Sequence, residues 1–244
     1  MTYAKEYAGY VLDLLKTINE NESGAIDQAG KLLAERLAND GLLYVFGCGH
    51  SHMIEEELFY RAGGLIAVSP IFETAAMLHD GAVKSSQIER MSGYAPHVLD
   101  RYPIGSKDVI LVVSTSGINP FPIEMADAAR KKGAKVIVIS SLNYKDRPAR
   151  TADGRHLPDT ADLLIDNHVP TGDAIVTVRS DGTKAGPVST IASVFIANSI
   201  MLSACEALNE KGMEPEVFVS GNCPGGDEHN KTMIELYRTR VKNL

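Results

Sequence analysis

The sequence has few cysteines and no excess of positive charge. Its 244 residues contain three cysteines, Cys48, Cys205 and Cys223, too few and too scattered for a disulfide framework or a cysteine-based zinc site. Lys and Arg number 24 against 31 Asp and Glu, and the formal net charge of −7 opposes binding to nucleic acid or an anionic membrane. The first six residues have neither the basic nor the apolar region of a signal peptide. We therefore expect a cytoplasmic protein that binds neither nucleic acid nor membrane.

Long hydrophobic runs are also scarce, with one exception. Residues 185–205 carry no charge, but six serine, threonine and asparagine side chains interrupt the run. That is polar for a membrane span, so we expect a helix buried between layers or between subunits. The chain has no low-complexity segment, and its hydrophobic content of 44% is enough for a substantial core.

The most informative stretch is a buried strand followed by a hydroxyl-rich turn and a helix. The apolar run Val109–Val113 predicts a strand of a parallel sheet. An amphipathic helix follows from Pro120, and between them lie the polar or small residues Ser114, Thr115, Ser116, Gly117 and Asn119. Hydroxyls and free N–H groups at a helix start can surround a phosphate without any Lys or Arg. The competing interpretation is a helix cap and turn with no ligand.

A second stretch repeats this design. Residues 42–46 predict a strand, Gly47–His52 a turn, and Met53 the start of a helix. Gly47 and Gly49 allow a ligand to approach the backbone closely. The turn is not a dinucleotide fingerprint, because His52 replaces its third glycine.

Strands alternate with helices along the chain, which predicts an α/β fold with one doubly wound parallel sheet flanked by helices. Ligands of such sheets bind beyond the carboxyl ends of the strands, where both turns lie. We expect one domain over 1–244. Its predicted helices and strands, besides those above, are two helices of an N-terminal arm (2–19 and 24–39), helices 87–100 and 227–242, and strands 65–69, 161–166, 173–178 and 216–220.

The two turns together resemble the paired signature of the sugar isomerase (SIS) domain family, over about Ala25 to Gly212. This resemblance implies a flavodoxin-like or Rossmann-like three-layer sandwich, a homodimer or homotetramer, and a sugar phosphate as ligand. It also implies that the phosphosugar is bound by Gly47, Gly49, Ser51, Ser114, Thr115, Ser116, Gly117 and Asn119. An aldose–ketose isomerase of a sugar phosphate is the leading hypothesis. A non-catalytic phosphosugar sensor and an amino-sugar phosphate lyase or etherase remain open, and neither end of the chain carries a helix-turn-helix extension.

Isomerisation needs a base that moves a proton between adjacent carbons. Glu55, Glu56 and Glu57 follow the first turn, but successive helical residues cannot all face one site. We predict Glu57 as the base, with Glu55 as its competitor and His52 as a further candidate. The alternative is a solvated acidic face near a helix start.

Phosphoheptose isomerase, a member of the SIS family, carries zinc-linked His and Glu residues where this chain has Glu57 and Arg61. Its further His and Gln fall near Asn198 and Thr190. All four positions differ, which argues against the same zinc site and the same catalytic set. His50 and His52 lie two residues apart in the first turn, but no nearby Cys or third His completes a ligand set. We therefore expect no metal and no cofactor.

One segment is basic in an otherwise acidic chain. Leu142–Pro158 contains Lys145, Arg147, Arg150, Arg155 and His156. The segment is either a solvated loop or a rim that attracts the anionic ligand.

Overall fold

The computed structural model of the chain describes residues 2–244, and its centre is a five-stranded parallel sheet. The strands are β1 (Leu43–Gly47), β2 (Val68–Pro70), β3 (Val109–Val113), β4 (Lys135–Ser140) and β5 (Leu163–Asp166), in the order β2-β1-β3-β4-β5. Every neighbouring pair is parallel. The direction in which strands are added reverses between β1 and β3, and ligands of such sheets bind at this switch point. The predicted α/β class is confirmed.

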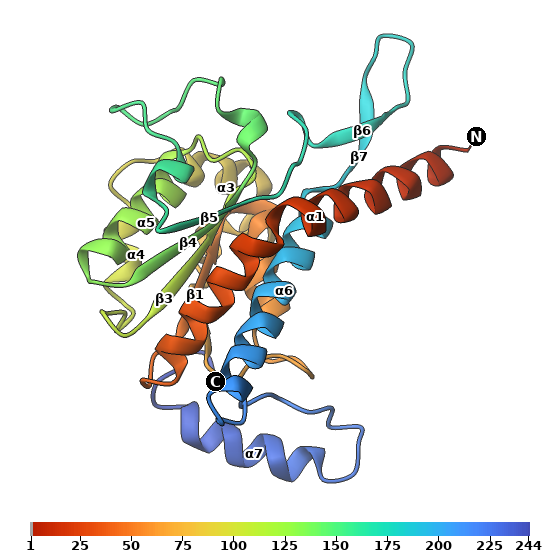
Figure 1. Cartoon of the computed structure of the whole chain (residues 1–244). Coiled ribbons are helices and arrows are strands. Elements are labelled where there is room, and N and C mark those ends of the chain that lie inside the picture. The colour runs from red at the N-terminus through yellow and green to blue at the C-terminus, as the bar shows by residue number, and fades with distance from the viewer. Residues whose placement is uncertain (1) are drawn as a thin grey trace.

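Helices cover both faces of the sheet (Figure 1). Successive strand residues point to opposite sides, so the apolar strands present a hydrophobic surface on each face. On one face, Val109, Leu111 and Val113 of β3 join a core with α1 (Tyr3–Leu37), α2 (Met53–Leu58) and α6 (Ser189–Glu210). On the other face, Ile110 and Val112 join a second core, to which α4 (Ala95–Leu99), α5 (Pro120–Lys131) and α7 (Gly226–Tyr237) contribute. Short 3₁₀ turns, among them Gly49–His52 and Leu78–Asp80, connect these elements, and α3 (Ala82–Glu89) precedes α4.

Two helix predictions are wrong in their boundaries. The N-terminal segment is one helix of 35 residues, not two. Gly24 costs about 1 kcal/mol in a helix interior, but Ile18 and Ile26 on either side of it are both buried, so core packing carries the helix across. The predicted helix 87–100 is instead α3 and α4, interrupted at Gly93, whose φ of 81° is left-handed.

Two strand predictions are wrong in their partners. Residues 173–178 contain β6 (Ala174–Thr177), which pairs antiparallel with β7 (Lys184–Pro187) in a hairpin outside the main sheet. Residues 216–220 form no strand, because Val217 makes only an isolated antiparallel bridge with Leu65. Both segments have strand-like composition, but neither joins the central sheet, whose edge strands are β2 and β5.

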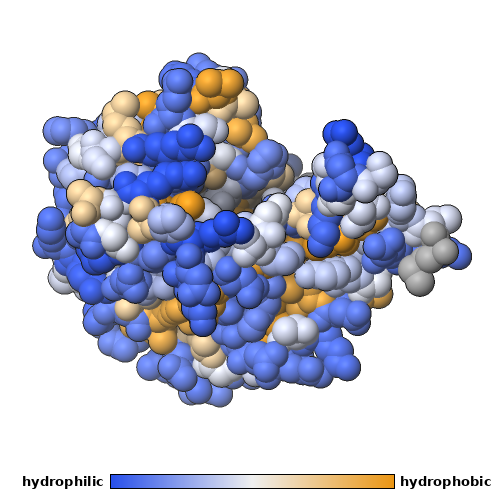
Figure 2. Space-filling model, turned by 90° about the horizontal axis from the view of Figure 1, so that it is seen from above, coloured by the Kyte–Doolittle hydropathy of each residue, from blue (hydrophilic) through white to orange (hydrophobic). Residues whose placement is uncertain are grey.

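The β6–β7 hairpin and the N-terminal part of α1 stand apart from the rest of the molecule (Figures 1 and 2). Tyr7 of α1 donates a hydrogen bond from its hydroxyl to the Pro187 carbonyl, 2.7 Å away, which ties the two together. Seen from above, hydrophobic surface is visible between this projection and the body (Figure 2).

Helix α6 is long and apolar enough to cross a membrane by length and composition, with a mean hydropathy of 1.7 in its most apolar window. Half of that window is buried inside the protein. Ile196 and Ile200 belong to the core that α6 shares with α1, as expected for the core helix of a layered fold.

Candidate functional site at the carboxyl ends of β1 and β3

The two predicted turns begin at the same level of two adjacent strands. Gly47, the last residue of β1, is in register with Val113, the last residue of β3. Consequently Ser51 of the first turn and Thr115 of the second line one small hollow. The start of α6 contributes three further hydroxyls to this hollow, from Ser189, Thr190 and Ser193. The Asp173 carboxylate already caps this helix end, because it accepts hydrogen bonds from the Val188 and Ser189 N–H groups and from the Ser189 hydroxyl. The hydroxyls left for an added anion are those of Ser51, Thr115, Thr190 and Ser193.

The β3 turn combines a structural role with an open face. The Ser114 hydroxyl is buried and accepts a hydrogen bond from the Gly117 N–H at 3.3 Å, so it stabilises the turn itself. Gly117 has a φ of +62°, and a Cβ there would lie 2.8 Å from the Ser140 hydroxyl, so only glycine fits. Ser116 is half-buried and lines a second hollow with Tyr144, Lys145 and His156. The interpretation as a ligand-free turn therefore fits Ser114, and the interpretation as a ligand site fits Ser116.

The β1 turn is close-packed around a buried carboxyl group. A Cβ on Gly47 would lie 2.5 Å from the Ser51 carbonyl oxygen, and Gly49 has a φ of +57°. Glu55 is 1% exposed, and its Oε1 accepts a hydrogen bond of 2.7 Å from the Gly47 N–H. Burial raises the pKa of Glu55 well above its usual range. Glu55 thus points back under the turn.

Glu89, at the end of α3, lies between the two turns. Burial raises the pKa of this half-buried carboxyl group, while a hydrogen bond from Asn119 and the charges of Arg150 and Arg90 act to lower it. Glu89 also acts electrostatically on Cys48, whose buried thiol has its pKa raised chiefly by desolvation. Asn119 in turn accepts a hydrogen bond of 2.6 Å from Arg150. A carboxyl group with a raised pKa beside these two turns has the properties of a general acid or base.

The other predicted catalytic residues lie in different surroundings. Glu57 forms an ion pair with Arg61 and accepts a hydrogen bond of 2.9 Å from the Asn198 side chain. His52 is buried, and its ring hydrogen-bonds to the Gly49 carbonyl. Glu57, Arg61 and Asn198 are three of the four positions that differ from phosphoheptose isomerase, and they meet in space. Arg61 places a positive charge of the chain itself among them.

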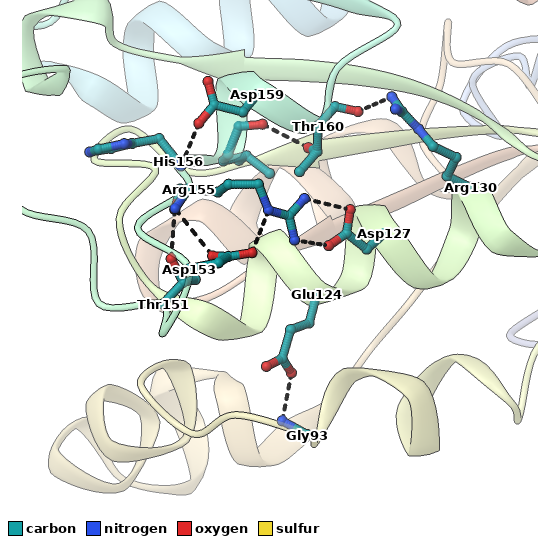
Figure 3. Close-up of polar contacts among 11 residues, drawn as sticks. Gly93, Glu124, Asp127, Arg130, Thr151, Asp153, Arg155, His156, Asp159 and Thr160 are labelled. Carbon is teal, nitrogen blue, oxygen red and sulfur yellow. Dashed lines mark hydrogen bonds and ion pairs between the residues drawn. The ribbon is translucent and has the colours of Figure 1, made fainter.

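The basic segment is held against α5 rather than being a free loop (Figure 3). The Arg155 guanidinium donates two hydrogen bonds to Asp127 of α5, at 3.2 and 2.7 Å, and a third to Asp153 at 2.6 Å. His156 begins the following 3₁₀ turn, where its N–H is bound by Asp159 at 2.8 Å (Figure 3). Of the basic residues, Arg150 hydrogen-bonds to the β3 turn through the Asn119 side chain, and Lys145 and His156 line the hollow beside Ser116. The segment therefore forms a docked rim of the site.

Sequence reasoning missed Glu89 and the hydroxyls of α6. Glu89 belongs to no motif, and the helix predicted over 87–100 hides the fact that Glu89 is the last residue of α3. Ser189, Thr190 and Ser193 stand in the sequence as polar interruptions of an apolar run. Their spacing of i, i+1 and i+4 at a helix start was the available signal.

Comparison with known proteins identifies the family and the fold. The model of the SIS domain family matches residues 6–141. A UPF0309 protein of Geobacillus thermodenitrificans is 45% identical over 98% of this chain and 96% of its own length.

Two solved structures share the fold. Phosphoheptose isomerase GmhA of Neisseria gonorrhoeae has a TM-score of 0.57 at 16% identity, covering 83% of this chain and 99% of that one. The NanR protein of Vibrio vulnificus, complexed with ManNAc-6P, has a TM-score of 0.52 at 13% identity, covering 99% of this chain and 71% of that one. The family match and the close relative lead to one conclusion: the chain belongs to the SIS domain family, and within it to the UPF0309 proteins.

Proposed function

We propose that this protein is a sugar-phosphate isomerase that binds its substrate at the crevice between β1 and β3. The observation that carries the proposal is the Glu89 carboxyl group, with its raised pKa, between two turns rich in phosphate-binding groups. Similarity in fold to a phosphoheptose isomerase and to a protein complexed with ManNAc-6P supports a phosphorylated sugar as the ligand.

In the proposed reaction, the hydroxyls of Ser51, Thr115 and Ser116 hold the phosphate. The Glu89 carboxylate removes the proton from C2 of the aldose. The electron pair of that C–H bond forms the C1–C2 double bond while the π pair of the C1 carbonyl moves to O1, which gives an enediolate. The O2 hydroxyl proton moves to O1, the electron pair left on O2 forms the C2 carbonyl, and the C1–C2 π pair takes the proton from Glu89 at C1 to give the ketose. Glu57, Glu55 and His52 remain predictions for the proton transfers, but Glu57 is engaged by Arg61 and Asn198.

The test begins with a thermal-shift screen against pentose, hexose, heptose and N-acetylhexosamine phosphates. Any stabilising compound is then incubated with the protein in D2O and followed by NMR. We expect ketose with deuterium at C1 and re-formed aldose with deuterium at C2, because the proton held by Glu89 exchanges with D2O. Stabilisation without exchange would replace this proposal with a non-catalytic phosphosugar sensor, and loss of a C3 substituent would indicate a lyase or etherase.

We further propose that the chain forms a cytoplasmic homo-oligomer through α1 and α6. Leu12 of α1 and Leu202 of α6 are 68% and 62% exposed, and Tyr3, Tyr10 and Ile191 add to the exposed hydrophobic surface of the two helices. A two-fold interface would cover these side chains. Light scattering should give a mass that is a multiple of the 26.3 kDa chain, and Leu202→Glu should lower it. A wild-type monomer at micromolar concentration would contradict this assembly.

A further inference from the structure

Three side chains from two separate segments meet beside the β1 turn. The His52 Nε2 atom lies 3.4 Å from Glu56 Oε1, and the His79 Nε2 atom lies 3.8 Å from the same oxygen. His52 and Glu56 are one helical turn apart, whereas His79 comes from the 3₁₀ turn Leu78–Asp80. All three atoms lie within 4.8 Å of one another.

The orientation of His52 is fixed by the backbone. Its Nδ1 hydrogen-bonds to the Gly49 carbonyl, and because a carbonyl oxygen only accepts, Nδ1 must carry the proton. In the neutral ring Nε2 therefore presents a lone pair. His52 is 3% exposed, and its Nε2 atom is buried without a hydrogen-bond partner among the described residues. A buried nitrogen without a partner is costly, so it calls for a ligand.

We propose that His52, Glu56 and His79 bind a zinc ion. Zinc bonds of about 2.0–2.2 Å in a tetrahedron separate neighbouring ligand atoms by about 3.4 Å. The two contacts to Glu56 are already near that value, and His79, whose side chain is 64% exposed, is free to move closer. Two histidines and one glutamate are a zinc ligand set that leaves the fourth position to water or substrate, and the Gly49 carbonyl supplies the usual partner for the second ring nitrogen.

This site differs from the zinc-linked positions of phosphoheptose isomerase. Those positions correspond to Glu57 and Arg61 here, where the Arg61 cation pairs with Glu57. A zinc ion on His52, Glu56 and His79 would join the β1 turn to the segment that leads into α3. Since α3 ends at Glu89, the ion would help to position the proposed base. The inference does not depend on the sugar-phosphate chemistry, and its test uses zinc alone.

The experiment titrates ZnCl2 into the tag-free, chelator-treated full chain in competition with a coloured zinc indicator. The Cys223→Ser variant serves as the background, because the Cys223 thiol is exposed and a thiolate is a zinc ligand. We expect one ion per chain and a higher melting temperature with zinc. His79→Gln and Glu56→Gln, both at exposed positions, should each weaken zinc binding by at least about a hundredfold.

The matched control is His97→Gln, which removes an exposed histidine on α4 and should leave zinc affinity unchanged. Absence of stoichiometric zinc binding by the folded protein would overturn the proposal. So would zinc binding that His79→Gln and Glu56→Gln leave intact, or that His97→Gln weakens equally.

Discussion

The turns after β1 and β3 occupy equivalent positions in the sheet but differ in chemistry. The β3 turn, Ser114–Asn119, consists of hydroxyl, amide and apolar groups and has no titratable side chain. The β1 turn, Gly47–His52, contains two histidines and a cysteine, and the buried Glu55 supports it from below. The β3 turn therefore offers only neutral groups to an anion, whereas the β1 turn adds ionisable side chains to the hydroxyl of Ser51.

This difference has an electrostatic consequence for Glu89. A phosphate site made of Lys or Arg would lower the pKa of a neighbouring carboxyl group by stabilising its charged form. Neutral hydroxyls hold an anion without that effect. Arg150 is the exception at the β3 turn, and its charge acts to lower the pKa of Glu89.

The largest effect is expected when the proton-transfer group itself is removed. Glu89→Gln keeps the size and hydrogen-bonding capacity of the side chain but cannot accept a proton. It should bind the sugar phosphate nearly normally and lose exchange at C2 by at least about a hundredfold, measured by NMR in D2O. Glu57→Gln is the comparison, because it removes a carboxylate held by Arg61 and Asn198. Full exchange at C2 in Glu89→Gln together with loss of exchange in Glu57→Gln would assign the proton transfer to Glu57.

An intermediate effect is expected in the phosphate-binding hydroxyls. Ser51→Ala and Ser116→Ala should each weaken sugar-phosphate affinity about tenfold to a hundredfold, since a hydrogen bond to a charged group contributes about 1.5–3 kcal/mol. Calorimetry on folded variants measures this. Thr183→Ala, in the exposed tip of the β6–β7 hairpin, controls for hydroxyl loss in general. Unchanged affinity in both serine variants would remove the phosphate assignment.

A smaller effect, on stability, is expected for the support under the β1 turn. Glu55→Ala leaves the buried Gly47 N–H without its acceptor and should cost about 1–3 kcal/mol of unfolding free energy, measured with urea. Glu55→Gln keeps an acceptor oxygen in place and should cost less. Equal losses in the two variants would show that the hydrogen bond to Gly47 is not what stabilises the turn.

The smallest effect is expected in the pH profile. Glu89 must be deprotonated to act as a base, so kcat/KM should fall as the pH drops below its raised pKa. Arg150→Leu removes a charge that lowers this pKa, so the acidic limb should move to higher pH, by up to about one unit. Arg147→Leu removes the same charge from the same exposed segment and should leave the limb in place. A shift to lower pH in Arg150→Leu would contradict the assignment.

Strong local patterns in the sequence predicted the sheet and the position of the site. The strand Val109–Val113 is buried on both faces, so its uninterrupted apolar run predicts a strand although polar and apolar residues do not alternate. The two turns are recognisable because glycine and hydroxyl residues follow directly on such strands. The ends of parallel strands meet at one edge, and this placed Ser51 near Thr115 without knowledge of the connecting helices.

The features that could not be predicted from the sequence depend on contacts between residues far apart in the chain. Gly24 resembles a helix end, but the packing of buried side chains on both sides of it keeps α1 continuous. The segment 173–178 has the composition of a strand, yet its partner is a hairpin strand rather than the sheet. Glu89 lies far from either turn in sequence, and only the path of α3 brings it beside Asn119 and Cys48.

The most direct test of the central claim, that Glu89 shares one site with the phosphate, is the pKa of Glu89 itself. The side-chain carboxyl 13C resonance can be followed by NMR across pH, and Glu89→Gln assigns the signal. We predict a pKa above the ordinary glutamate range in the free protein, and a further rise when the dianionic sugar phosphate saturates the site, because a nearby negative charge disfavours the carboxylate. An ordinary pKa that the bound ligand leaves unchanged would contradict the account.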